Sequence, residues 1–191
     1  MLTLCLAGDF LLPDINLQNP VVKVFIPAAG IFITVLFCKY KYQYSLTTDL
    51  RLLNPRFHQL LFLLFIALIW MLGTDYFMNW RGPFDFTSWY TQPLYVSISR
   101  ILAVCFFGPV LEELIFRGLL FHKIADVLKM NKWLTIIILA ATWSALHYTY
   151  SIPVIVVIFI EGLLLGTAVV KSGSLIIPIA MHICWNLYAV W

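Results

Sequence analysis

Six long apolar stretches recur along the chain, and they constrain its fold more than any other feature. A helix that crosses a bilayer needs about 20 apolar residues, within a range of roughly 17 to 25. Unbonded backbone groups are costly in hydrocarbon, so single segments of this kind cross membranes as helices. The stretches lie at about residues 21–38, 60–73, 94–121, 133–147, 152–170 and 174–190. The sequence therefore predicts an all-α, polytopic transmembrane helical bundle with about six spanning helices.

Composition leaves room for one membrane domain. Hydrophobic residues make up 62% of the 191 residues and charged residues 11%, whereas soluble domains carry about 25% charged residues. We expect a single membrane-embedded domain over residues 1–191, with a motif-bearing core at about 94–191. The apolar start, Met1 to Leu12, has no basic flank. We interpret it as an interfacial or re-entrant piece and not as a signal peptide.

Basic residues gather in three of the connections between the apolar stretches. With six spans, these three connections fall on one side of the membrane, and basic short loops favour the cytoplasm. The residues are Lys39, Lys41, Arg51, Arg56, Lys123, Lys129, Lys132 and Lys171. The pattern predicts a multi-pass protein of the cell (cytoplasmic) membrane. The aromatic stretch from Thr74 to Gln92 is expected to be an outer loop at the headgroups.

Two adjacent acids interrupt the third apolar stretch. Ionised side chains are expensive inside a membrane and usually mark a functional site. Arg117 follows Glu113 by four residues, one helical turn, so the two should pair on one helix face. Glu112 has no such partner on its own helix. We therefore expect Glu113 and Arg117 to be supporting structure and Glu112 to act in chemistry.

Two later stretches each carry a polar pair at helical spacing. Trp143 and His147 are four residues apart, and so are His182 and Asn186, which places each pair on one helix face. Peptide hydrolysis needs a base that activates water, donors for the oxyanion, and a proton for the leaving amine. An acid, two imidazoles and an amide around one cavity can supply all three. No Ser or Cys shares a helix face with a His in an obvious way, so we expect direct attack by water.

At these residues the sequence resembles the CAAX protease and bacteriocin-processing family, intramembrane proteases that include the type II CAAX prenyl endopeptidases. The family's motifs are Glu-Glu-x-x-x-Arg, an aromatic residue (usually Phe) followed four positions later by His, and His followed four positions later by Asn or Asp. They occur here as Glu112-Glu113 to Arg117, Trp143 to His147, and His182 to Asn186. The resemblance covers about Phe106 to the C-terminus.

The resemblance implies a role for each of these residues in one cavity. Glu112 would be the base that activates water with help from His147, and His182 and Asn186 would stabilise the oxyanion. The cavity would open toward the cytoplasmic side. Trp143 and Glu161 are possible substrate-groove residues, although Glu161 could instead pair with Arg100. The substrate would be a membrane-anchored protein or peptide, such as a prenylated CAAX tail, a bacteriocin leader or a sorting-signal tail.

Three alternatives stay open at this point. Glu112, His147 and His182 form a plausible zinc set, but there is no HExxH and no obvious carboxylate that would orient the histidines. We therefore favour a metal-free glutamic-type peptidase. A non-catalytic membrane partner-binding or immunity protein could keep the same motifs. A proton-coupled transporter would more often show repeats and broken helices, and nothing in the sequence indicates nucleic-acid binding.

Overall fold

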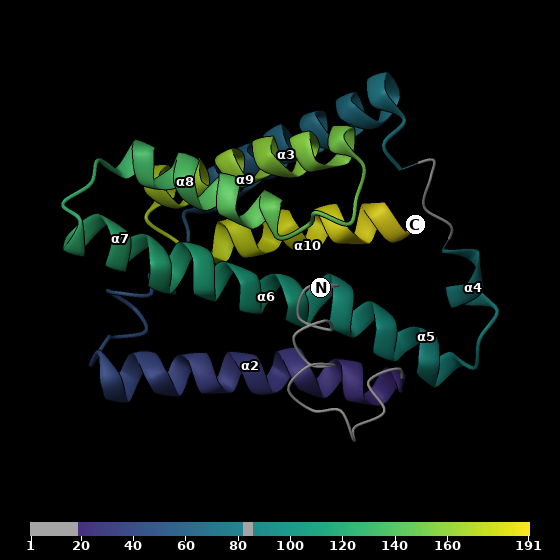
Figure 1. Cartoon of the computed structure of the whole chain (residues 1–191), viewed down its shortest axis with the longest axis horizontal. Helices are drawn as coiled ribbons and strands as arrows, with labels where there is room; N and C mark the ends of the chain where they lie inside the picture. Colours follow the sequence, from purple (N-terminus) through teal and green to yellow (C-terminus); the bar gives the residue numbers. More distant parts are fainter. Residues whose placement is uncertain (1–18, 82–85) are drawn as a thin grey trace.

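The computed structural model describes residues 19–81 and 86–191, and the described residues form helices and no strands. The predicted all-α class is confirmed. The interpretation of residues 1–12 lies outside the described residues. Helices run roughly side by side along the longest axis of the molecule (Figure 1). The helices are α2 (Pro20–Lys41), α3 (Phe57–Met78), α4 (Thr87–Tyr90), α5 (Leu94–Ile101), α6 (Gly108–Glu113), α7 (Phe121–Val127), α8 (Lys132–Ala145), α9 (Ile152–Ser172) and α10 (Ile176–Val190).

Helices α5, α6 and α7 form one continuous rod, because two π-helical segments, Leu102–Phe107 and Leu114–Leu120, join them. Four described helices are long and apolar enough to cross a membrane: Val22–Lys41, Phe57–Met78, Leu94–Ala125 and Ile152–Ser172. Two more apolar helices, α8 and α10, are shorter. All six predicted helices are therefore present, and a multi-pass helical membrane bundle fits them.

Two predicted boundaries are wrong. Helix α3 was expected to end near Gly73 but continues to Met78 and ends where Asn79 adopts a left-handed conformation (φ 45°), a common helix stop. The start of the expected aromatic outer loop is therefore helical. Helix α8 ends at Ala145, so His147 lies in the turn that follows it.

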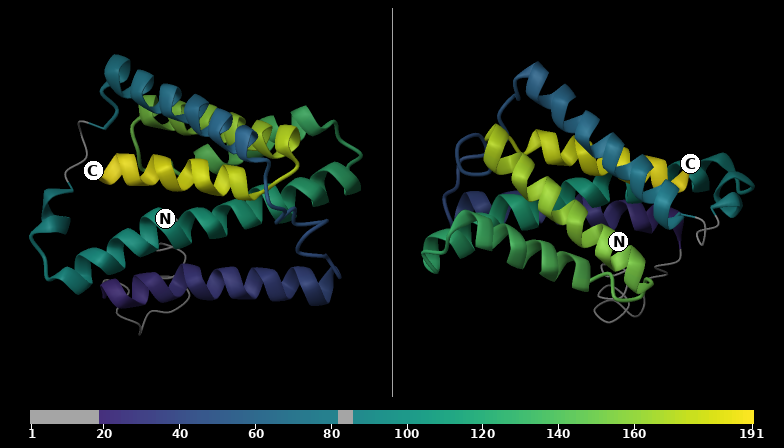
Figure 2. Two further views of the ribbon diagram at one scale, coloured as in Figure 1. Left: turned by 180° about the vertical axis from the view of Figure 1, so that it is seen from behind. Right: turned by 90° about the horizontal axis from the view of Figure 1, so that it is seen from above.

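The three basic connections meet at one end of the molecule, on the left in Figure 1 and on the right in the left-hand view of Figure 2. Leu175 donates its backbone N–H to the Arg51 carbonyl at 2.8 Å, and the Ser174 hydroxyl donates to the Leu53 carbonyl at 2.6 Å. His122 also contacts the Asp49 carbonyl. The three basic connections thus lie at the same end of the bundle, as six spans that alternate in direction require.

Helices α8 and α9 pack closely because α9 presents glycines to α8. A Cβ at Gly162 would lie 3.0 Å from the Cβ of Ala140, 3.1 Å from its Cα and 3.2 Å from Cε3 of Trp143. A Cβ at Gly166 would lie 2.8 Å from a methyl carbon of Ile136. Small residues at such positions let helix backbones approach within a membrane. The contact brings α9 against the end of α8, where Trp143 lies.

We expect Gly162→Ala to lower the free energy of unfolding by about 1–3 kcal/mol, the usual cost of overpacking. The added methyl group would press on the backbone of α8, which cannot rotate away as a side chain can. The matched control is Gly73→Ala in α3, where a new Cβ meets nothing within 4 Å and Ala favours the helix. Equal thermal stability of the two variants in detergent would contradict this account of the α8–α9 contact.

Candidate active site

A buried ion pair, Glu113 with Arg117, lies behind the site. Arg117 Nη1 lies 3.0 Å from Glu113 Oε1, and the two side chains are 2% and 0% exposed. Arg117 also donates from Nη2 to the Gly162 carbonyl of α9 at 3.3 Å, and its guanidinium lies 4.6 Å from the centre of the Trp143 ring. The pairing expected from the four-residue spacing is present, and it extends to two further helices.

Glu113 also orients a histidine. His182 on α10 places Nδ1 3.0 Å from the same Oε1 of Glu113, and both side chains are buried. A carboxylate on a ring nitrogen fixes the orientation of an imidazole. The expectation that no carboxylate orients the histidines is therefore wrong for His182. Sequence spacing could not show this contact, because it joins residues on separate helices.

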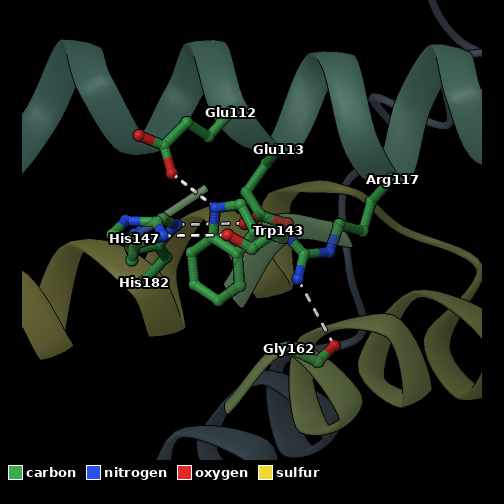
Figure 3. Close-up of polar contacts among 7 residues, drawn as sticks. All are labelled: Glu112, Glu113, Arg117, Trp143, His147, Gly162 and His182. Atoms are coloured by element: carbon green, nitrogen blue, oxygen red, sulfur yellow. Dashed lines mark hydrogen bonds and ion pairs between the residues drawn. The ribbon is translucent and has the colours of Figure 1, made fainter. Parts of the chain in front are cut away.

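Glu112 points away from Glu113, as neighbouring residues on a helix must, since each residue turns by about 100°. Its Oε2 accepts a hydrogen bond from the indole Nε1–H of Trp143 at 2.7 Å (Figure 3). The sequence alone could not show whether the aromatic residue at position 143 only packs or also donates a hydrogen bond. The indole is 3% exposed, so the donor side of this part-buried bond is shielded from solvent.

His147 reaches the site because α8 is short. Its ring Nδ1 lies 2.9 Å from the Trp143 carbonyl, and its ring centre lies 5.4 Å from that of Trp143 in an edge-on arrangement. The prediction that Trp143 and His147 share a helix face is wrong, because the helix ends between them. The turn nevertheless brings His147 to the side of Trp143 that faces Glu112 (Figure 3).

The placement of Asn186 follows from a proline in the long rod. Gly108 donates its N–H to Ala103, five residues back, whereas an α-helix would use Val104. Pro109, the next residue, has no N–H to give. The Val104 carbonyl thus loses its helical donors, and the side chain of Asn186 donates to it at 2.9 Å. A backbone carbonyl inside a membrane helix needs such a partner, so the π-helical segment orients the amide of Asn186 through this part-buried bond.

These side chains meet at one cavity of about 320 Å³. Its polar lining comes from four helices and the turn after α8: Glu112, Trp143, His147, Glu161, His182 and Asn186. Glu113 and Arg117 lie behind this lining. All the residues expected from the sequence are thus within one region, with the two supporting residues placed as expected.

Glu161 lines the cavity and does not pair with Arg100. It is 4% exposed, and its Oε1 has no hydrogen-bond partner among the described residues. The Arg100 guanidinium instead lies 5.8 Å from the Trp89 ring centre. The structure thus places Glu161 in the cavity lining, and its role toward a substrate stays a prediction.

The zinc alternative finds no ready-made site. Within residues 19–81 and 86–191, no three His, Cys, Asp or Glu side chains are grouped so that they could hold one metal ion. Glu112 and His147 both have bonds to Trp143, and Nδ1 of His182 faces Glu113. These contacts do not involve Nε2 of either histidine, the atom through which a zinc ion could still bind.

The cavity occupies the half of the molecule away from the basic connections. Its lining includes residues from the segment after α3, from α4, from the α8–α9 turn and from the end of α10, namely Trp80, Trp89, Tyr150 and Val190. The resemblance implied a cavity on the cytoplasmic side, and the charges placed the basic connections there. The cavity lining and the basic connections lie toward opposite ends of α9 and α10, and the side of the membrane that each faces stays a prediction.

Comparison with known proteins agrees with the motifs. The model of the family described as "Type II CAAX prenyl endopeptidase Rce1-like" matches residues 93–188, which carry all three motifs. The chain belongs to this family. The resemblance noted from the sequence is confirmed.

Among curated proteins, an Escherichia coli protein named "Uncharacterized 24.3 kDa protein" is similar to this chain. It is 27% identical over 86 residues, which cover 44% of this chain and 40% of that protein. The match thus spans less than half of the relative. No solved structure matches the chain.

We expect Arg117→Met to lower the free energy of unfolding by about 3–5 kcal/mol, because it leaves a buried carboxylate without its cation. Thermal unfolding in detergent measures the loss. The double variant Glu113→Gln with Arg117→Met removes both charges and should recover part of the lost stability. If the single variant were as stable as the wild type, the buried pair would not support the site.

Proposed function

We propose that this chain is an intramembrane endopeptidase that hydrolyses a peptide bond of a membrane-associated protein or peptide by direct attack of water. The observation that carries the proposal is one cavity lined by Glu112, His147, His182 and Asn186. These groups supply a base, a water-holding ring and two oxyanion donors, the minimum set for the reaction. Family membership supports the peptidase class.

Glu112 is the proposed base, and His147 holds the water beside it. The Trp143 carbonyl can only accept, so a hydrogen bond there places the proton of His147 on Nδ1. In the neutral ring Nε2 is then an acceptor, and it can receive one hydrogen of the water. Glu112 takes the other proton as the water oxygen attacks the carbonyl carbon.

His182 and Asn186 are the proposed donors to the oxyanion. An amide has two N–H donors; Asn186 uses one on Val104, and the other can face the substrate. His182 faces Glu113 with Nδ1, so it can donate from Nε2 as an imidazolium, a form that the carboxylate of Glu113 stabilises. Each such donor lowers the barrier by about 2.7–4 kcal/mol in other hydrolases.

The tetrahedral intermediate then collapses. The carbon–nitrogen bond breaks, and the amine leaves with the proton that Glu112 took from water. The products are a carboxylic acid, which keeps the second hydrogen of the water, and an amine, and Glu112 returns to its starting form; the acid loses its proton to solvent on release. Among the described residues that line the cavity there is no Ser, Thr or Cys, which supports a route without an acyl-enzyme.

We expect Glu112→Gln to lower turnover by at least about 10²–10⁴, the usual contribution of a general base, while the protein stays folded. The assay incubates the purified protein in nanodiscs with a pool of membrane-derived peptides and finds new termini by mass spectrometry. Asp49→Asn, which removes one negative charge in a loop outside the cavity lining, is the control. Full activity of Glu112→Gln would exclude Glu112 as the base.

The same preparation separates the alternatives. In the proposed mechanism activity survives a chelator, and the active protein contains no stoichiometric metal. Loss of activity that zinc restores would favour the metal-dependent version. Binding of peptides without cleavage, in wild type and variants alike, would favour a partner-binding protein.

We expect Trp143→Phe to lower kcat about ten- to a hundredfold, because a hydrogen bond to a charged group contributes roughly 1.5–3 kcal/mol and this one fixes Glu112. The matched control is Trp70→Phe. The indole N–H of Trp70 is buried without a described partner, so its loss removes no hydrogen bond. Replacing Trp143 with 3-benzothienylalanine keeps the ring shape and removes only the donor. Equal activity of this variant and the wild type would contradict the role of the indole N–H.

A further inference from the structure

Glu161 is a buried acid to which the proposed mechanism gives no role. It lies in α9, is 4% exposed and lines the cavity. Its Oε1 has no hydrogen-bond partner among the described residues, although a polar group buried without a partner is costly. The other two acids of the site are held, because Glu113 pairs with Arg117 and Glu112 accepts a hydrogen bond from Trp143. An ionisable side chain of this kind inside a membrane indicates a function, with a partner to be identified.

The face of α9 that lines the cavity is apolar until it reaches Glu161. The lining residues on this helix are Val154, Val157, Ile158 and Glu161. Their spacing of three, one and three residues places them on one helix face. From Val154 to Glu161 this face extends over about two helical turns, or roughly 10 Å. The cavity thus has an aliphatic strip that ends on a carboxyl group.

The cavity does not supply a cation of its own for this acid. No Lys or Arg is among the described residues that line it, and Arg117 behind the lining binds Glu113 and the Gly162 carbonyl. Aromatic rings form much of the remaining lining, and the faces of such rings attract cations. The rings are those of Trp80, Trp89, Tyr150 and Trp185. Acid and aromatic rings together favour a positively charged group in this part of the cavity.

Glu161 lies next to the proposed reaction centre. A Cβ at Gly162, the following residue, would lie 3.2 Å from Cε3 of Trp143. The indole of Trp143 in turn donates to Glu112 at 2.7 Å. A group that pairs with Glu161 is therefore held beside the bond that Glu112 and its water attack.

From this arrangement we propose that Glu161 selects substrates with a Lys or Arg side chain next to the scissile bond. The methylene stem of that side chain lies along the aliphatic strip, as the stems of Lys and Arg do on apolar surfaces, and its charged head pairs with Glu161. An acid in the corresponding pocket sets specificity in the same way in one class of serine proteases. An apolar side chain there would leave the acid unpaired and so weaken binding of the transition state. The inference rests on the proposed peptidase function and makes Glu161 a specificity-determining residue.

Cleavage of matched peptides tests the selection. In the pool of membrane-derived peptides, Lys and Arg should be enriched next to the cuts relative to their frequency in the pool. One cleaved peptide is then made with Lys or with norleucine at that position, because norleucine keeps the methylene stem without the charge. We expect kcat/KM to be roughly 30-fold or more higher for the Lys peptide, since an unpaired buried charge costs at least that much. Equal kcat/KM values in the wild type would overturn the inference.

The variant Glu161→Gln keeps the shape of the side chain and removes its charge. It should bring the two kcat/KM values close together, by slowing cleavage of the Lys peptide far more than that of the norleucine peptide. The control Asp49→Asn removes a charge outside the cavity lining and should keep the wild-type ratio. A structural role of Glu161 would lower both values alike, and that result, or an unchanged ratio in Glu161→Gln, would contradict the selection.

Binding separates this inference from the proposed function. The probes are a leucine–alanine membrane peptide with one central Lys and the same peptide with norleucine there, added to Glu112→Gln protein in nanodiscs. The Lys peptide should bind more tightly, and adding Glu161→Gln should remove the difference; equal binding of the two probes would also overturn the inference. If the difference is found but the wild type cuts no peptide, the proposed function fails and the selection stands. If peptides are cut without preference for Lys or Arg, the selection fails and the proposed function stands.

Discussion

The buried carboxylate of Glu113 is the interaction on which the rest of the site depends. Arg117 compensates its charge within the same rod, and His182 joins it from α10. Through Arg117 the pair reaches the Gly162 carbonyl on α9 and the ring of Trp143 on α8. A charge without such partners would be too costly in a membrane. One paired charge thus links four helices around the cavity.

Departures from regular helix then position two of the polar side chains that line the cavity. The π-helical turn before Pro109 frees the Val104 carbonyl and so positions Asn186. The early end of α8 lets His147 turn back beside Trp143. Irregular helical turns are frequent at functional sites. Here each irregularity places one polar side chain that a straight helix would direct elsewhere.

Spacing along single helices predicted part of this arrangement. The helices themselves and the Glu113–Arg117 pair follow from apolar length and from a four-residue step. The contacts of Glu113 with His182 and of Val104 with Asn186 could not be predicted, because they depend on the rotation of packed helices and on a shifted backbone register. The hydrogen bond from Trp143 could not be predicted either, because it depends on where Glu112 lies. The set of residues that line the cavity could not be predicted either, because it depends on how the helices pack.

The central claim is that water, held between Glu112 and the imidazole of His147, cuts a peptide bond inside this cavity. An experimental structure of Glu112→Gln with a membrane peptide bound in lipid tests it most directly. The account predicts a peptide carbonyl with its oxygen within hydrogen-bond distance of His182 and Asn186, and its carbon facing residue 112. A peptide bound elsewhere, or these side chains turned away from a common water-filled space, would contradict the account.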